Sequence, residues 1–401
     1  MERAGEKKAG WVACLRRVNA ITFLNYFVSG ALTLLIPLLL LAKHVNVAVI
    51  GLVLSILPLV FLVARLIFSS IADYVGWSHV FLLINWPSAF FSTLIYYFSS
   101  TWPFFALGKI VEALRESSYW AVSRTAIYHL SPNRAGHEAT KMNGIIWIGM
   151  ALGGAMAGLG IFYLGFSMSL LVLALVALAI GVPAVMLWRS SSTKPLSKTE
   201  RFLNPLDPRG RSRIFWVASV ALLFNSIATY PLVNLLLPIF MSQKLGYSYI
   251  VIGVLFMLYY AISAAATWLS VEKSLSWKRA AALTVASVVA SIFLAVSGFI
   301  FPAALLILAF VRGYGVGFFE HTVLKVAKDS KNLSLDIGML HAPMRLAEFS
   351  SLVAGGFIAQ TLGYAPVFIA CGVFMGVHLF MSLYVIKGNV VKTMKTPVPL
   401  S

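Results

Sequence analysis

Charged residues stand inside three stretches of the sequence that are otherwise apolar. They are Lys109, Glu112, Arg115 and Glu116 in the first stretch, Arg312 and Glu320 in the second, and Arg345 and Glu348 in the third. An ionisable group in hydrocarbon is strongly unfavourable, so such groups usually face a protein interior or an aqueous pathway. A carboxylate beside a cation can take up or release a proton when a solute captures that cation. These residues therefore indicate a pathway for an ionic solute and for protons.

The first group has the spacing of one helix face. At about 100° per residue, that face carries Lys109, Glu112, Glu116 and Trp120, with Arg115 at its edge. We expect this face to line a central cavity.

The second and third groups stand at comparable depths in their stretches. Depth alone suggests that Arg312 pairs with Glu348 and that Glu320 pairs with Arg345. These pairs can also have a structural role, because an ion pair can hold neighbouring helices together or keep a gate closed. The structural and functional interpretations have equal weight for Glu320 and Arg345. Function is favoured for Lys109, Glu112, Arg312 and Glu348.

Uncharged residues can complete the site. Asn25 and Asn225 occupy similar places in the two halves of the chain, and Tyr259 can stack on a solute or bond to it. Taken singly, each is more often a packing residue. With Arg65 in the stretch 49–72, the apolar stretches hold five cations and four carboxylates when Arg124 near a stretch end is set aside. This small positive surplus favours an anionic or zwitterionic substrate.

The elements that position these residues follow from composition. Of the 401 residues, 60% are hydrophobic and 11% are charged, whereas soluble proteins average about half and a quarter. Crossing a bilayer takes about 20 apolar residues in a helix. Twelve such stretches fall at 18–41, 49–72, 80–99, 103–127, 141–164, 166–188, 214–241, 249–270, 280–300, 302–325, 337–361 and 365–386. We therefore expect an all-α integral membrane protein with twelve transmembrane helices.

The net charge of +18 is explained by where the basic residues stand. With the amino terminus inside, 23 of the 31 lie in predicted cytoplasmic segments, and only Lys43 and Lys244 lie in outer loops. Cytoplasmic loops of membrane proteins carry such an excess. We expect a multi-pass protein of the plasma membrane with both termini cytoplasmic, and no nucleic-acid partner.

The two halves of the chain resemble each other. Ile50-Gly51 recurs as Ile252-Gly253, and matching prolines, cations and Leu-Gly pairs recur at offsets near half the chain length. Such a duplication predicts two pseudo-symmetric six-helix bundles, at 1–188 and 214–401, joined by a basic cytoplasmic linker at 189–213. Internal repeats are typical of secondary transporters, whose site lies between the halves.

With these features the whole chain resembles the major facilitator superfamily. The loop between the second and third helices of that family reads Gly-x-x-x-Asp-Arg-x-Gly-Arg-Arg, and Asp73 and Gly76 match it while its basic residues are missing. The resemblance implies a gate contact for Asp73, and Lys109 stands where the family often places a cation. Drug antiporters of the family carry a Gly-Pro pair in the fifth helix, but no proline follows Gly153.

These observations favour one function over several alternatives. A proton-coupled secondary transporter of a small organic anion or zwitterion, as symporter or antiporter, is favoured, and efflux of drugs or amphipathic compounds is the alternative. No ATP-binding Gly-x-x-x-x-Gly-Lys-Ser/Thr sequence occurs. A membrane-embedded enzyme is a remote alternative, because the seven histidines are dispersed. We expect a monomer among membrane lipids, with no catalytic residues, cofactor or metal.

Overall fold

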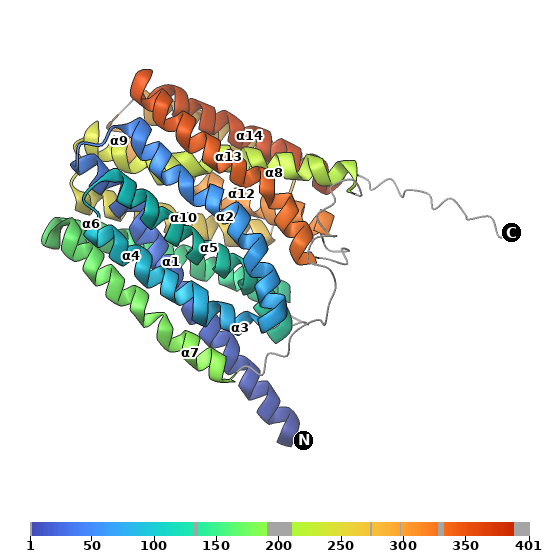
Figure 1. Ribbon diagram of the computed structural model, residues 1–401. Coiled ribbons are helices and arrows are strands. Elements are labelled where there is room, and N and C mark those ends of the chain that lie inside the picture. Colours follow the sequence, from blue (N-terminus) through green and yellow to red (C-terminus); the bar gives the residue numbers. More distant parts are fainter. Residues whose placement is uncertain are drawn as a thin grey trace.

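The computed structural model is built from helices throughout its described part, which comprises residues 2–131, 135–190, 211–272, 275–296, 298–327 and 333–388 (Figure 1). The helices of the first half are α1 (Glu2–Ala42), α2 (Val47–Val75), α3 (Trp77–Val80), η1 (Phe81–Asn85), α4 (Trp86–Phe98), α5 (Trp102–Leu130), α6 (Ala135–Ala179) and α7 (Gly181–Ser190). Those of the second half are α8 (Arg213–Pro231), η5 (Leu232–Leu236), α9 (Leu237–Gln243), α10 (Tyr249–Glu272), α11 (Trp277–Val296), α12 (Phe301–Ala327), α13 (Leu333–Thr361) and α14 (Tyr364–Lys387). The elements η1 and η5 are single turns of π-helix.

The described residues contain twelve helical passes of membrane-spanning length. Nine segments are both long and apolar enough to cross a bilayer. The longest, Lys141–Ser190, holds two passes because Gly165 interrupts it with a φ of 75° and a ψ of 173°. Helices α5 and α13 have 29 residues each, but their charges lower their apolarity. The predicted twelve-helix architecture agrees with this count.

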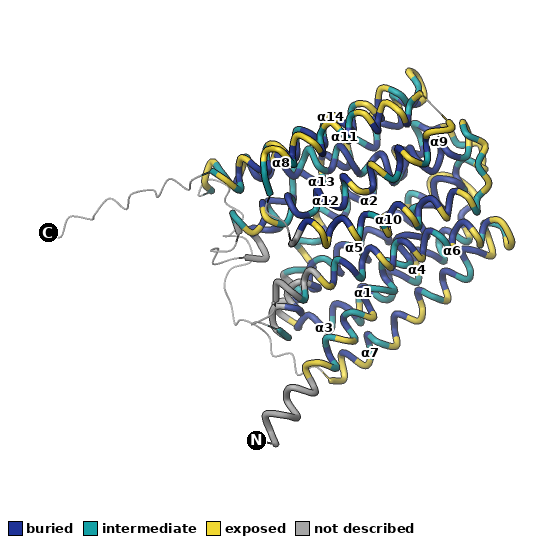
Figure 2. Tube along the Cα trace, turned by 180° about the vertical axis from the view of Figure 1, so that it is seen from behind, coloured by how far each residue is buried: buried dark blue, intermediate teal, exposed yellow. Residues whose placement is uncertain are grey.

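The passes form two groups that meet along two helix pairs. Helix α2 of the first half packs on α13 of the second, and α6 packs on α10. Helix α1 begins and α14 ends at the same end of the bundle (Figure 1). Buried residues face the interior of the helix assembly, and exposed ones face outward (Figure 2). Many exposed positions are large and apolar, such as Phe98 and Val285, as a lipid-facing surface requires.

The internal duplication is visible in the backbone. Gly165 and Gly363, which match in the sequence repeat, adopt nearly the same positive-φ conformation, with φ of 75° and 87°. Each joins two successive passes of its half. Only glycine adopts this region without steric penalty. The predicted domain boundaries remain a prediction, because most of the linker at 189–213 lies outside the described residues.

Four glycines bring the two halves together at symmetry-related places. Gly158 of α6 contacts Gly253 of α10, and Gly51 of α2 contacts Gly356 of α13. The sequence repeat relates Gly51 to Gly253. Gly158 and Gly356 are 198 positions apart, which is the offset that relates Gly165 to Gly363. Small residues allow membrane helices to approach closely. The interface of α6 with α10 and that of α2 with α13 are therefore formed by corresponding surfaces of the two repeats.

A matched pair of substitutions tests this packing. A Cβ on Gly158 would lie 2.7 Å from the Cα of Gly253, whereas a Cβ on Gly154, four residues earlier, would make an ordinary contact at 3.4 Å with Phe256. We expect Gly158→Ala to destabilise the fold by about 1–3 kcal/mol through overpacking, and Gly154→Ala to leave it nearly unchanged. Unfolding temperatures of the two variants in detergent measure this. Equal temperatures for both would contradict the assigned contact.

Candidate functional site

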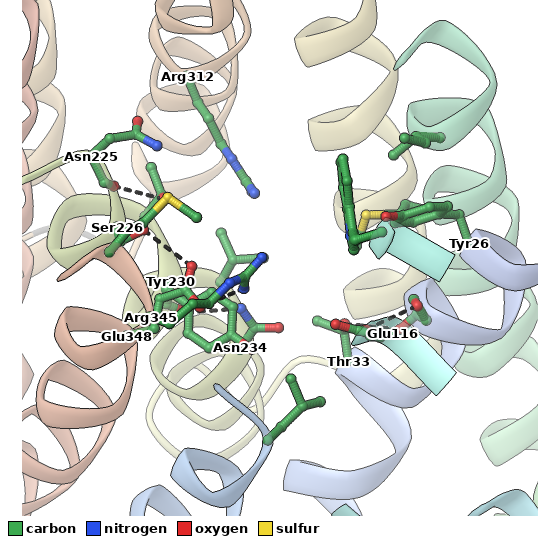
Figure 3. A pocket seen from close by; sticks show the side chains of 18 of the residues that line it. Tyr26, Thr33, Glu116, Asn225, Ser226, Tyr230, Asn234, Arg312, Arg345 and Glu348 are labelled. Carbon is green, nitrogen blue, oxygen red and sulfur yellow. Dashed lines mark hydrogen bonds and ion pairs between the residues drawn. The ribbon is translucent and has the colours of Figure 1, made fainter. Parts of the chain in front are cut away.

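A cavity of about 290 Å³ lies between the two halves and receives side chains from both (Figure 3). Its walls come from α1, α2, α5 and α6 on one side and from α8, η5, α10, α12 and α13 on the other. Nine predicted site residues line it: Lys109, Glu112, Glu116, Trp120, Asn225, Arg312, Glu320, Arg345 and Glu348. The structure thus brings together charges that are more than 200 positions apart in the sequence.

On the wall formed by the first half, Glu112 is the centre of a buried cluster. Its carboxylate accepts a bond of 2.7 Å from the Lys109 ammonium and one of 2.6 Å from the Tyr96 hydroxyl. The Arg115 guanidinium lies 3.7 Å away. These partners satisfy a charge that would otherwise be unfavourable in the bilayer.

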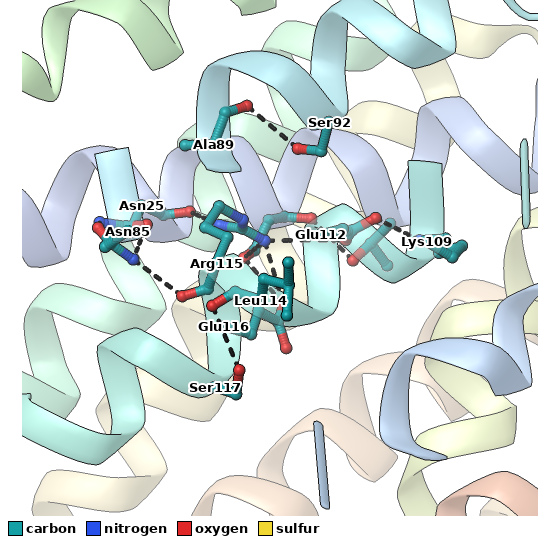
Figure 4. A network of polar contacts seen from close by, with 12 residues as sticks. Asn25, Asn85, Ala89, Ser92, Lys109, Glu112, Leu114, Arg115, Glu116 and Ser117 are labelled. Atoms are coloured by element: carbon teal, nitrogen blue, oxygen red, sulfur yellow. Dashed lines mark hydrogen bonds and ion pairs between the residues drawn. The ribbon is translucent and has the colours of Figure 1, made fainter. Parts of the chain in front are cut away.

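Arg115 is not among the residues that line the cavity, and it lies within a network of polar contacts (Figure 4). It is only 1% exposed. Its guanidinium donates to the backbone oxygen of Asn25 and to the Ser29 hydroxyl, each at 2.8 Å, and lies 3.2 Å from Glu116. The side chain therefore ties α5 to α1, which supports the structural interpretation of this charge.

Asn25 belongs to the same buried network. Its amide donates to the Asn85 side chain at 2.8 Å, and the Asn85 amide donates to the backbone oxygen of Arg115 at 2.9 Å. Asn85 ends the π-helical turn η1 and was missed by the sequence analysis, although an asparagine in an apolar stretch is itself a signal. The two repeat-related asparagines thus differ, since Asn225 lines the cavity and Asn25 does not.

On the opposite wall, Arg345 and Glu348 form an ion pair of 2.6 Å within α13. Ser226 of α8 donates to the second oxygen of Glu348 at 3.1 Å. The predicted pair of Arg312 with Glu348 is therefore wrong, because the helical spacing of three residues brings Arg345 to Glu348 first. Arg345 also lies 3.9 Å above the ring of Phe61, which belongs to α2 of the other half.

Arg312 contacts aromatic groups. Its guanidinium lies 5.1 Å from the ring centroid of Trp147 and 5.7 Å from that of Tyr259, and it donates to the Tyr259 hydroxyl at 3.4 Å. Tyr259 is buried and does not line the cavity, so it contributes to the site through Arg312.

Other lining residues were not among the predicted site residues. Arg65 and His341 lie together across the α2–α13 interface, with 3.3 Å between Arg65 Nη1 and His341 Nδ1. Tyr230, Asn143 and Asn234 add polar atoms. Their polarity within apolar stretches was the available signal. Among the described residues, no cluster of three histidine, cysteine or acidic side chains could hold a metal ion.

The loop motif is only partly described. Gly76 lies between α2 and α3 and has a φ of 94° and a ψ of 144°. This conformation favours glycine. Asp73 stands in the last turn of α2, but its side chain lies outside the described ones. The gate contact of Asp73 stays a prediction.

Removing Arg115 or Arg312 should have different effects on stability. We expect Arg115→Met to destabilise the protein by about 3–5 kcal/mol, because it leaves buried carboxylates with fewer partners. Arg312→Met removes two ring contacts and one long hydrogen bond to the Tyr259 hydroxyl, so we expect at most about 2 kcal/mol. Thermal unfolding in detergent compares them. A smaller effect for Arg115 than for Arg312 would refute the structural role of Arg115.

Comparison with known proteins adds to this description. A sequence model of the Major Facilitator Superfamily matches residues 18–330. A search of curated protein sequences finds no match. A mutant of the nucleoside transporter NupG superposes with a TM-score of 0.73 over 93% of this chain and 100% of its own, at 15% identity. A bacterial homologue of the human lysosomal transporter Spinster, inward-facing and occupied, gives 0.66 over 92% and 96%, at 16% identity.

Proposed function

This chain belongs to the major facilitator superfamily, and we propose that it is a secondary active transporter of a small organic anion or zwitterion. The observation that carries the proposal is the charged cavity between the two halves. A site at the interface of two repeats can be exposed to either side of the membrane when the halves rock against each other. The paired glycine contacts of α6 with α10 and of α2 with α13 provide surfaces along which the halves can move.

Proton coupling is supported by two of the carboxylates that line the cavity, each with a cation from its own helix beside it. Glu112 has Lys109, and Glu348 has Arg345. A solute anion bound in the same cavity adds a negative charge near these carboxylates, and either carboxylate then binds a proton more readily. Binding of an anion and binding of a proton are thereby linked.

Efflux of amphipathic compounds is the second candidate. Aromatic side chains on both walls favour it, including Tyr26, Trp120, Tyr230 and Phe319. The nucleoside transporter among the similar folds adds nucleosides to the solutes worth testing, although at 15% identity the likeness concerns the fold alone.

The setting of the protein is also part of the proposal. We place it in the plasma membrane as a monomer. The basic residues in the predicted inner segments support cytoplasmic termini. The even number of passes agrees with both ends lying on one side.

A ligand screen tests the function directly. Purified protein is heated with organic acids, amino acids, nucleosides, sugars and hydrophobic cations, because a bound ligand raises the apparent unfolding temperature. Compounds that stabilise the protein are then followed as labelled solutes into proteoliposomes. Failure of every class both to bind and to cross the membrane would overturn the transporter assignment.

The coupling carboxylates are tested with the solute that the screen identifies. We expect Glu348→Gln or Glu112→Gln to abolish accumulation driven by a pH gradient, because the amide cannot bind and release the proton. Exchange of labelled for unlabelled solute needs no net proton movement and should persist. Lys244→Gln, in the loop after α9, serves as the control. Unchanged pH dependence in both glutamine variants would reject these residues as coupling groups.

A further inference from the structure

Arg312 differs from two other cations of the cavity wall, Lys109 and Arg345. Lys109 has the carboxylate of Glu112, and Arg345 has that of Glu348. Within the described residues, no carboxylate forms an ion pair with Arg312, whose contacts are with aromatic groups. Arg312 is thus a cation of the cavity wall whose charge no described carboxylate compensates through an ion pair.

The position of Arg312 favours an incoming anion. The side chain is half-buried and reaches into the cavity from the wall that carries Asn225 and Ser226 (Figure 3). A guanidinium in a low-dielectric site is stabilised by a carboxylate or phosphate, which it can bind through two parallel hydrogen bonds. An aromatic ring compensates the charge less well. The solute can supply the partner that the protein does not.

Trp147 holds the guanidinium from the other half of the molecule. It belongs to α6, whereas Arg312 belongs to α12, and the distance from the guanidinium carbon to the ring centroid is 5.1 Å. The Trp147 ring lies on one side of the guanidinium, and a planar guanidinium carries several N–H groups that can bind an oxyanion. The anion site is thus assembled from both halves.

The remaining walls limit the rest of the solute. A volume of about 290 Å³ is at the low end of the roughly 300–1,000 Å³ found for ligand pockets. Tyr26 and Trp120 line the first half and Tyr230 and Phe319 the second. Such rings favour a small flat solute by stacking.

We propose that Arg312 binds the oxyanion of the solute, that Trp147 positions it, and that the solute is a small aromatic carboxylate or phosphate. This inference rests on the proposed transport function and narrows its substrate class. The opposite wall carries Glu116, which already has Arg115 and Ser29 as partners, so the anion is directed to Arg312.

Matched probes test the anion site in the full-length protein. Benzoate is compared with benzamide, and phenyl phosphate with phenol, by thermal shift and by direct binding in detergent. We expect the charged member of at least one pair to bind more tightly, and acetate to bind more weakly than benzoate. If benzoate and phenyl phosphate bind no better than their neutral partners, the inference is overturned.

Variants assign the binding to Arg312. We expect Arg312→Gln to weaken binding of the charged probe by at least about thirtyfold. Arg312→Lys, which keeps the charge without the planar fork, should give an intermediate loss. Lys244→Gln should bind like the wild type. Equal affinities in Arg312→Gln and Lys244→Gln would refute the assignment. If Arg312→Gln does not fold, wild-type affinity in Arg312→Lys would refute the bidentate contact.

The positioning role of Trp147 has a separate readout. Trp147→Ala should reduce the ratio of benzoate to benzamide affinity, while Trp147→Phe should retain most of it. A loss of packing alone would weaken binding of both probes equally, and that result would reject the positioning role of Trp147.

Different results contradict the proposed substrate class and the proposed transport function. A protein that moves neutral or cationic solutes but ignores both anions contradicts the class alone, whereas one that moves no solute contradicts the proposed function.

Discussion

The placement of charge in a low-dielectric environment constrains this whole structure. A cation or carboxylate between membrane helices must have a partner, water, or a ligand. Arg115 meets this constraint through Asn25, Ser29 and Glu116, and so fastens α5 to α1. Arg345 meets it with Glu348. Where the partner is an aromatic ring, as for Arg312, the charge is left for something that enters the cavity.

The two halves therefore use their charges differently despite their common origin. In the first half, Arg115, Asn25 and Asn85 form a closed network behind the cavity wall. In the second half, Asn225 and Arg312 line the cavity. The repeat-related asparagines Asn25 and Asn225 thus have different surroundings, whereas the cations Lys109 and Arg312 both line the cavity.

The interfaces between the two halves are symmetric, whereas the polar networks within the two halves differ. Gly51 and Gly253 are repeat-related, and so are Gly158 and Gly356, and all four stand where backbone meets backbone. Two arginine contacts also join the halves, since Arg345 of α13 lies over Phe61 of α2 and Arg312 of α12 lies near Trp147 of α6. The proposed solute site thus lies beside the surfaces that would move in the proposed transport cycle.

The sequence by itself determined the twelve passes, the duplication and the helix face that carries Lys109, Glu112, Glu116 and Trp120, because apolar length and helical periodicity are local properties. It could not decide the partners of the charges. Residues at similar depth on different helices meet only if the helices are neighbours and correctly rotated. Packing alone set those rotations, so Asn25 joins Asn85 and Arg312 lies beside aromatic rings. The pair of Arg345 with Glu348 lies within one helix and follows from their spacing of three residues.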